Sequence, residues 1–357
     1  MVVVGSGGVG KTTLAAALGL VSAEEGNRTL VMTFDPSLRL KDALGVDDET
    51  SKDNIEVQLE SPGSLYASLL DAKLTFDRLV SRYAPDGRSR RRILENRYYQ
   101  HLAGGLAGIL EYMAVERLFE VSSSGDFDRI ILDTPPTRQA LDFLEAPERI
   151  VGFLNSGALK LALRSWFDQE GHLRPTRHLG SLGRRFESYL DEVVGLDLLR
   201  DMVEFFQAFG PLYDGFRERA QEVEALLRSE ETLFTLVSGP GEEKIPDTLF
   251  FARRLQDAGY PLGPIAVNRM HPAPEEPVVP FDVDAGESLD GRQLLLWLGE
   301  RDARGLQRLA SLIAEDQTLI GIPLLASEPS DLASLQVLGS MFDSLLEKAV
   351  AVPRTHR

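Results

Sequence analysis

Short apolar runs alternate with longer amphipathic segments along this chain, and together they predict a sheet covered by helices. The runs lack strict alternation of polar and apolar residues, which is typical of parallel strands buried on both faces. They cover residues 2–4, 29–34, 128–133, 233–237, 265–268 and 318–320. We therefore predict an α/β fold with a mostly parallel sheet and helices on both of its faces.

The segments between these runs predict helices, and two of them are unusually long. Ordinary helices are expected at 11–25, 38–44, 247–258, 300–314 and 332–349. The stretch 65–119 and the stretch 147–229 both predict almost continuous helix. We predict one domain over 1–357, in which insertions at about 64–120 and 147–230 form an inserted helical subdomain.

Aromatic residues gather in the second helical stretch. Their spacing favours a buried core, with a cofactor or peptide groove as the alternative. They are Phe205, Phe206, Phe209, Tyr213 and Phe216, with Leu212 among them.

Composition narrows the classes of function. The 357 residues carry a net charge of −17, which argues against generic binding to nucleic acid or to anionic lipid. A basic cluster at Arg88, Arg90, Arg91 and Arg92 favours a solvated helix face, with a phosphate or partner contact as the alternative. There is no cysteine, hence no disulfide and no thiolate metal site.

The apolar runs also bear on location. None approaches the roughly 18 residues of a membrane-spanning helix, so no integral membrane segment is expected. The first residues already belong to a predicted strand, which leaves no room for a signal peptide. The expected location is cytoplasmic.

A glycine-rich segment joins the first strand to the first helix. It reads GSGGVGKTT from Gly5 to Thr13 and fits G-x-x-x-x-G-K-[ST], the phosphate loop (P-loop) of NTPases. Glycines let backbone N–H groups approach a phosphate, the lysine reaches the β- and γ-phosphates, and the following hydroxyl binds Mg²⁺. The predicted nucleotide-binding residues here are Gly7, Gly8, Val9, Gly10, Lys11, Thr12 and Thr13. The alternative is a glycine turn that only joins strand to helix.

Two aspartates end predicted strands, where a P-loop NTPase needs carboxylates. Asp133 is expected to support Mg²⁺ together with Thr12, and Asp35 is expected to orient the attacking water. The alternative for each is an aspartate that caps the following helix or turn. Ligands of such sheets lie beyond the carboxyl ends of the strands, which is where both aspartates and the loop fall.

Several motifs resemble the family of arsenite-pump ATPases (ArsA), which includes ATPases that target tail-anchored membrane proteins. GGVGKTT is similar to the family's deviant loop GKGGVGKTT, and TFDP with DALG is similar to its first switch. The segment FDRIILDTPPT resembles the second switch, and Val267-Asn268 resembles the strand end that reads adenine. The resemblance covers most of the chain.

This resemblance implies an ATP- and Mg²⁺-dependent dimer that closes on ATP and opens on hydrolysis. Lys11 and Asp35 would be its catalytic residues, Thr12 and Asp133 would hold the metal, and Asn268 would pair with adenine. The implied function is a conformational switch that acts on a protein client at the helical subdomain.

The chain also departs from the family pattern. Ser6 stands where the family has a lysine that reaches the partner's phosphates, Leu38 replaces the first switch's histidine, and Arg138-Gln139 replaces Gly-His of the second switch. The alternative function is therefore a weakly hydrolysing or non-hydrolysing regulatory subunit in a heterodimer with a paralogue, which would supply the lysine. A homodimer, a partition ATPase and a small-molecule kinase remain the other interpretations.

Overall fold

The computed structural model describes residues 1–34, 39–45, 54–97, 99, 109–155, 205, 208–273 and 291–351. The chain divides into two compact units. The first, the sheet unit, comprises Met1–Leu69, Val121–Leu141 and Leu226–Arg357. The second, the helical unit, comprises Leu70–Glu120 and Asp142–Ala225.

One eight-stranded sheet, in the order β3-β4-β2-β5-β1-β6-β7-β8, forms the centre of the sheet unit. Every neighbouring pair is parallel except β3 with β4. The strands are β1 (Val2–Gly5), β2 (Arg28–Thr33), β3 (Ile55–Val57), β4 (Ser64–Leu69), β5 (Arg129–Asp133), β6 (Phe234–Ser238), β7 (Leu262–Met270) and β8 (Leu319–Pro323). The predicted α/β class with a mostly parallel sheet is confirmed.

The prediction of helix at 65–69 is wrong, because these residues belong to β4. All six residues of β4 pair in register with β2, from Arg28 with Ser64 to Thr33 with Leu69. A short apolar run reads the same in a buried helix as in a strand, and only its pairing partner decides between them. The short antiparallel strand β3 was not predicted at all.

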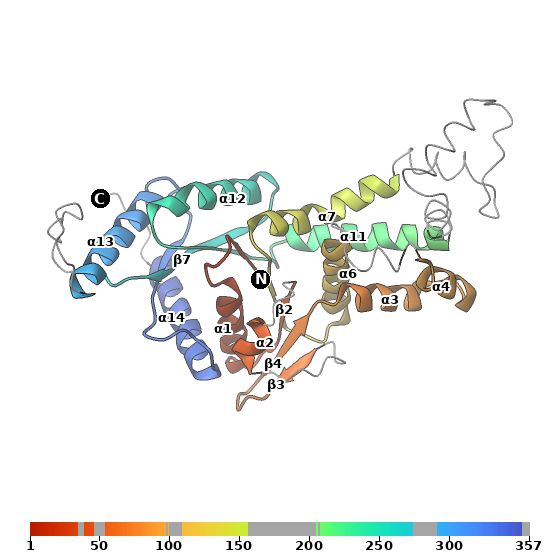
Figure 1. The fold of residues 1–357 in the computed structure, drawn as a ribbon, viewed down its shortest axis with the longest axis horizontal. Helices are drawn as coiled ribbons and strands as arrows, with labels where there is room; N and C mark the ends of the chain where they lie inside the picture. Colours follow the sequence, from red (N-terminus) through yellow and green to blue (C-terminus); the bar gives the residue numbers. More distant parts are fainter. Residues whose placement is uncertain are drawn as a thin grey trace, which may run out of the picture. The chain divides into compact units, whose positions relative to one another are not determined.

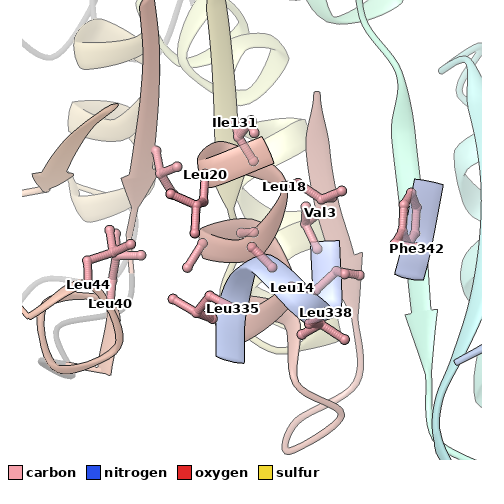
Figure 2. Packing of buried hydrophobic residues seen from close by; sticks show 14 of the residues in the cluster. Val3, Leu14, Leu18, Leu20, Leu40, Leu44, Ile131, Leu335, Leu338 and Phe342 are labelled. Carbon is pink, nitrogen blue, oxygen red and sulfur yellow. The ribbon is translucent and has the colours of Figure 1, made fainter. Parts of the chain in front are cut away.

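Three helices cover one face of the sheet: α1 (Lys11–Glu24), α2 (Arg39–Leu44) and α14 (Leu332–Ala351). Helix α12 (Ile245–Asp257) covers the other face, and α13 (Gly291–Ala310) contacts β7 and the 3₁₀ turn η2 (Glu242–Lys244) (Figure 1). In Figure 2, Leu14 and Leu18 of α1 lie among side chains of the sheet and of α14, including Val3 and Leu338. This core fixes α1 and therefore the loop at its start.

Gly339 allows α1 and α14 to pack closely. A Cβ at this position would lie 2.5 Å from Val21 Cγ2 and 2.7 Å from the carbonyl oxygen of Ala17, both on α1. Gly339→Ala should therefore destabilise the protein by about 1–3 kcal/mol through overpacking. The matched control is Gly291→Ala at the start of α13, where a Cβ meets nothing within 4 Å. Urea denaturation of both variants tests this, and equal stabilities would contradict it.

Buried aromatic rings form the core of the helical unit. Its elements are α3 (Ala72–Tyr83), α4 (Gly87–Leu94), η1 (Gly210–Leu212) and parts of α6 (Ile109–Ser124), α7 (Thr137–Asn155) and α11 (Tyr213–Arg228). The cluster includes Phe76, Tyr99, Phe205, Phe209, Leu212 and Phe216. The predicted core role of the aromatic residues is thus confirmed where they are described; Phe206 lies outside the described residues.

Charged side chains complete this unit. Arg219 of α11 donates to Glu116 of α6 at 2.7 Å, and both residues are buried.

The basic cluster on α4 is exposed. Asp86 caps this helix by accepting hydrogen bonds from the backbone N–H groups of Arg88 and Ser89. The exposure agrees with a solvated helix face.

Candidate nucleotide-binding site

The loop between β1 and α1 has a backbone that only glycine adopts without strain. Gly8 has φ +77° and Gly10 has φ +91°, both in the left-handed region. A Cβ at Gly5 would lie 2.0 Å from the carbonyl oxygen of Val237, and a Cβ at Gly10 would lie 2.5 Å from Asn268 Nδ2. The fold thus leaves no room for a side chain at Gly5 or Gly10, whereas at Gly8 only the positive φ favours glycine.

The start of α1 favours an anion. Gly10 is the N-cap residue and provides no side-chain hydrogen bond to the first turn, which also contains no acidic residue. The first backbone N–H groups of a helix have no partner within the helix, and its dipole places partial positive charge there. A phosphate is the kind of group that such a helix start binds.

Lys11 adds a full positive charge at the same place. Its side chain is buried, and Nζ donates to the carbonyl oxygens of Gly5 at 3.1 Å and of Ser6 at 2.9 Å. These two carbonyls hold the ammonium group against the loop.

Asp133 joins the loop to two neighbouring strands. Its Oδ2 accepts hydrogen bonds from Thr12 Oγ1 at 2.7 Å and from Thr33 Oγ1 at 2.9 Å. The register of the sheet brings these groups together, because Asp133 at the end of β5 pairs with Val3 of β1 and with Thr33 of β2. The next residue, Thr134, donates its hydroxyl to the carbonyl oxygen of Val3 at 2.8 Å, which ties the end of β5 to β1.

Thr12 and Asp133 provide the donor set that fits Mg²⁺. The cation prefers oxygen ligands, binds through few protein groups and keeps several waters. A hydroxyl and a carboxylate 2.7 Å apart, beside a loop shaped for phosphate, match that chemistry. Groups of three or more carboxylate, histidine or cysteine side chains that could hold a metal do not occur within the described ranges.

Asn268 lies directly behind the loop. Its Nδ2 donates to the carbonyl oxygen of Val9 at 2.9 Å, and its Oδ1 accepts the backbone N–H of Arg269 at 2.9 Å. Each end of the amide retains capacity for one further hydrogen bond. The sequence predicted only a contact between Asn268 and adenine. The structure adds a hydrogen bond between Asn268 and the phosphate loop.

A pocket of about 250 Å³ opens beside Asn268 and the start of α1. Its walls come from the loop and α1, from the end of β7 and from the segment after β8. They include Gly10, Thr13, Asn268, Arg269, Leu324 and Glu328. Arg269 and the segment after β8 were missed from the sequence, because only the folded sheet places them beside the loop; the one local signal was the position of Arg269 next to a strand-end asparagine.

The structure brings together the loop, Lys11, Thr12, Asp133 and Asn268. Asp35 lies outside the described residues, as do Leu38 and the side chain of Arg138. Their roles stay predictions.

A parallel sheet with this loop at the end of a central strand defines the P-loop NTPase class. The model of the anion-transporting ATPases, the ArsA family, matches residues 1–174. Residues 1–174 of this chain are therefore similar to this family of ATPases.

Several curated proteins are similar to the chain. A putative arsenical pump-driving ATPase of Chlorobaculum tepidum is 28% identical over 161 residues, which are 41% of this chain and 35% of that protein. ATPase get3 of Schizosaccharomyces pombe is 31% identical over 174 residues, 47% of this chain and 50% of that protein. ATPase GET3 of Malassezia globosa is 24% identical over 336 residues, 93% of this chain and 87% of that protein.

The first two of these alignments span a third to a half of the relatives' length. Among the described helices, none has both the length and the apolar character needed to cross a bilayer.

Proposed function

We propose that this protein binds Mg·ATP at the loop and hydrolyses it. The observation that carries the proposal is the contact between Thr12 and Asp133, which sets a hydroxyl and a carboxylate beside the phosphate-shaped backbone and Lys11. A turn that merely joined a strand to a helix would not need these groups together. Saturable binding of Mg·ATP by calorimetry, with phosphate release in a steady-state assay, tests the proposal.

Each residue has a separate task in this proposal. Backbone N–H groups from Gly7 to Thr13 bind the phosphates, and Lys11 contacts the β- and γ-phosphates. Thr12 and Asp133 hold Mg²⁺, which neutralises charge on the phosphates when bound. Asp35 orients the attacking water, and the base occupies the pocket beside Asn268.

We further propose that the protein works as a dimer whose nucleotide-driven switch acts on a protein partner at the helical unit. The support is the similarity of residues 1–174 to the ArsA family together with the position of the second switch. That segment leaves β5 directly after Asp133, whose carboxylate already contacts the loop through Thr12. A change at the nucleotide therefore has a short covalent route into the chain that continues into α7.

Ser6 is the residue that bears on whether this protein hydrolyses ATP itself or is a regulatory subunit with little turnover. It is half-buried on the loop, beside the exposed Gly7 and Gly8. A cation supplied across an interface speeds hydrolysis by as much as ~10³–10⁵-fold in other P-loop NTPases. Serine at position 6, in place of the family's lysine, supports the alternative function, in which a paralogue in a heterodimer supplies the lysine.

Ser6→Lys should raise the ATPase rate of the protein alone by about tenfold or more, because it restores that cation to each copy. Ser6→Met is the matched control, with similar length and no charge, and it should leave the rate unchanged. Rates are compared over a range of protein concentrations, since an intersubunit contact requires association. A second measurement adds the paralogue to the wild-type protein. If neither Ser6→Lys alone nor wild type with the paralogue has a higher ATPase rate than wild type alone, the idea of a missing lysine is contradicted.

A further inference from the structure

The end of β7 has an irregular backbone next to the nucleotide site. Arg269 has φ +63°, and within the described ranges it is the one non-glycine residue with positive φ. The pairing of β7 with β8 shifts register between Val267 and Met270, at this same point. Strained backbone at the end of a strand costs free energy and often re-aims side chains toward a site.

The irregularity turns two consecutive side chains toward one target. In a regular strand, neighbouring side chains point to opposite faces. Here Asn268 bonds to the carbonyl oxygen of Val9 at 2.9 Å, and Arg269 Nη1 donates to that of Gly8 at 3.3 Å. Both side chains therefore contact the phosphate loop.

The guanidinium group of Arg269 also reaches the segment after β8. Its Nη2 donates to Glu328 Oε1 at 3.0 Å, so the side chain joins the phosphate loop to the far wall of the pocket. The side chains are 43% and 78% exposed, and an ion pair so open to water adds little stability. Stability alone does not account for the strained backbone that holds Arg269 here.

We propose that Arg269 positions the nucleobase, and this inference rests on the proposed function. Held between the carbonyl of Gly8 and Glu328, the planar guanidinium lies at the wall of the pocket where it can pack against an aromatic ring. Arginine stacks on aromatic faces more readily than lysine does, and a purine presents such a face. Glu328 fixes the plane of the guanidinium and so shares in the selection of the base.

The test distinguishes the contribution of the base to binding from the contribution of the phosphates. Arg269→Asn removes the guanidinium, while asparagine tolerates positive φ, so the irregular strand end is kept. Affinities are measured by calorimetry for Mg·ATP and for Mg·tripolyphosphate, which lacks a base. We expect Arg269→Asn to bind Mg·ATP about tenfold more weakly and to bind Mg·tripolyphosphate within about twofold of wild type.

Two further variants complete the experiment. Arg269→Gly also adopts positive φ and should reproduce the loss, which guards against misfolding of a single variant. Glu328→Gln should weaken Mg·ATP by about threefold through a less ordered guanidinium. An equal loss for both ligands would overturn the inference and leave Arg269 as a brace of the loop. Unchanged affinity for both ligands would overturn it as well. If wild type binds neither ligand, the proposed function itself fails.

Discussion

Lys11→Ala should weaken the binding of Mg·ATP by about a hundredfold or more and so abolish hydrolysis at ordinary ATP concentrations. The side chain is buried in the loop, and its ammonium is held by the carbonyl oxygens of Gly5 and Ser6. Charge-assisted hydrogen bonds contribute about 1.5–3 kcal/mol each, so the loss of two phosphate contacts corresponds to this change in affinity. Fluorescent-nucleotide titration measures it directly.

Lys41→Ala is the matched control for this experiment. Lys41 is as buried as Lys11, with 7% of its surface exposed in each case, but it lies on α2 and not on the loop. Loss of a buried lysine as such would affect both variants, whereas loss of a phosphate ligand affects Lys11→Ala alone. If Lys11→Ala retains wild-type affinity while thermal melting shows it folded, the loop does not bind phosphate.

The sequence was most informative where structure is local. The spacing of Gly5, Gly10, Lys11 and Thr12 depends only on one strand, one turn and one helix, and each of these was predicted in place. The meeting of Asp133 with the loop could also be anticipated, because parallel strands bring their carboxyl ends to one edge of a sheet. What the sequence could not provide was the register that sets the 2.7 Å contact with Thr12.

The errors and omissions concern pairing between distant segments. β4 resembles a helix until β2 is placed beside it, since both patterns are short apolar runs. Likewise, nothing near Arg269 in the sequence indicates its positive φ, which occurs where the pairing of β7 with β8 changes register. The pocket wall after β8 follows from the same long-range packing.

Asp35→Asn should leave the affinity for Mg·ATP within about twofold of wild type and reduce turnover by about 10²–10³-fold. A positioned carboxylate that orients or deprotonates an attacking water contributes about 10²–10⁴-fold to a rate, whereas it adds little to the binding of the nucleotide. The described backbone ends one residue before it, at Phe34, whose N–H donates to the carbonyl oxygen of Asp133 at 3.4 Å. The chain thus leaves β2 beside the carboxylate that contacts Thr12.

Asp257→Asn at the end of α12 is the control, since it removes one exposed carboxylate that lies outside the loop and both switch segments. Steady-state rates and nucleotide titrations on wild type and the three variants distinguish effects on binding from effects on turnover. Lys11→Ala should lose both nucleotide binding and turnover, Asp35→Asn should lose only turnover, and Asp257→Asn should lose neither. Wild-type turnover in Asp35→Asn would remove Asp35 from the reaction.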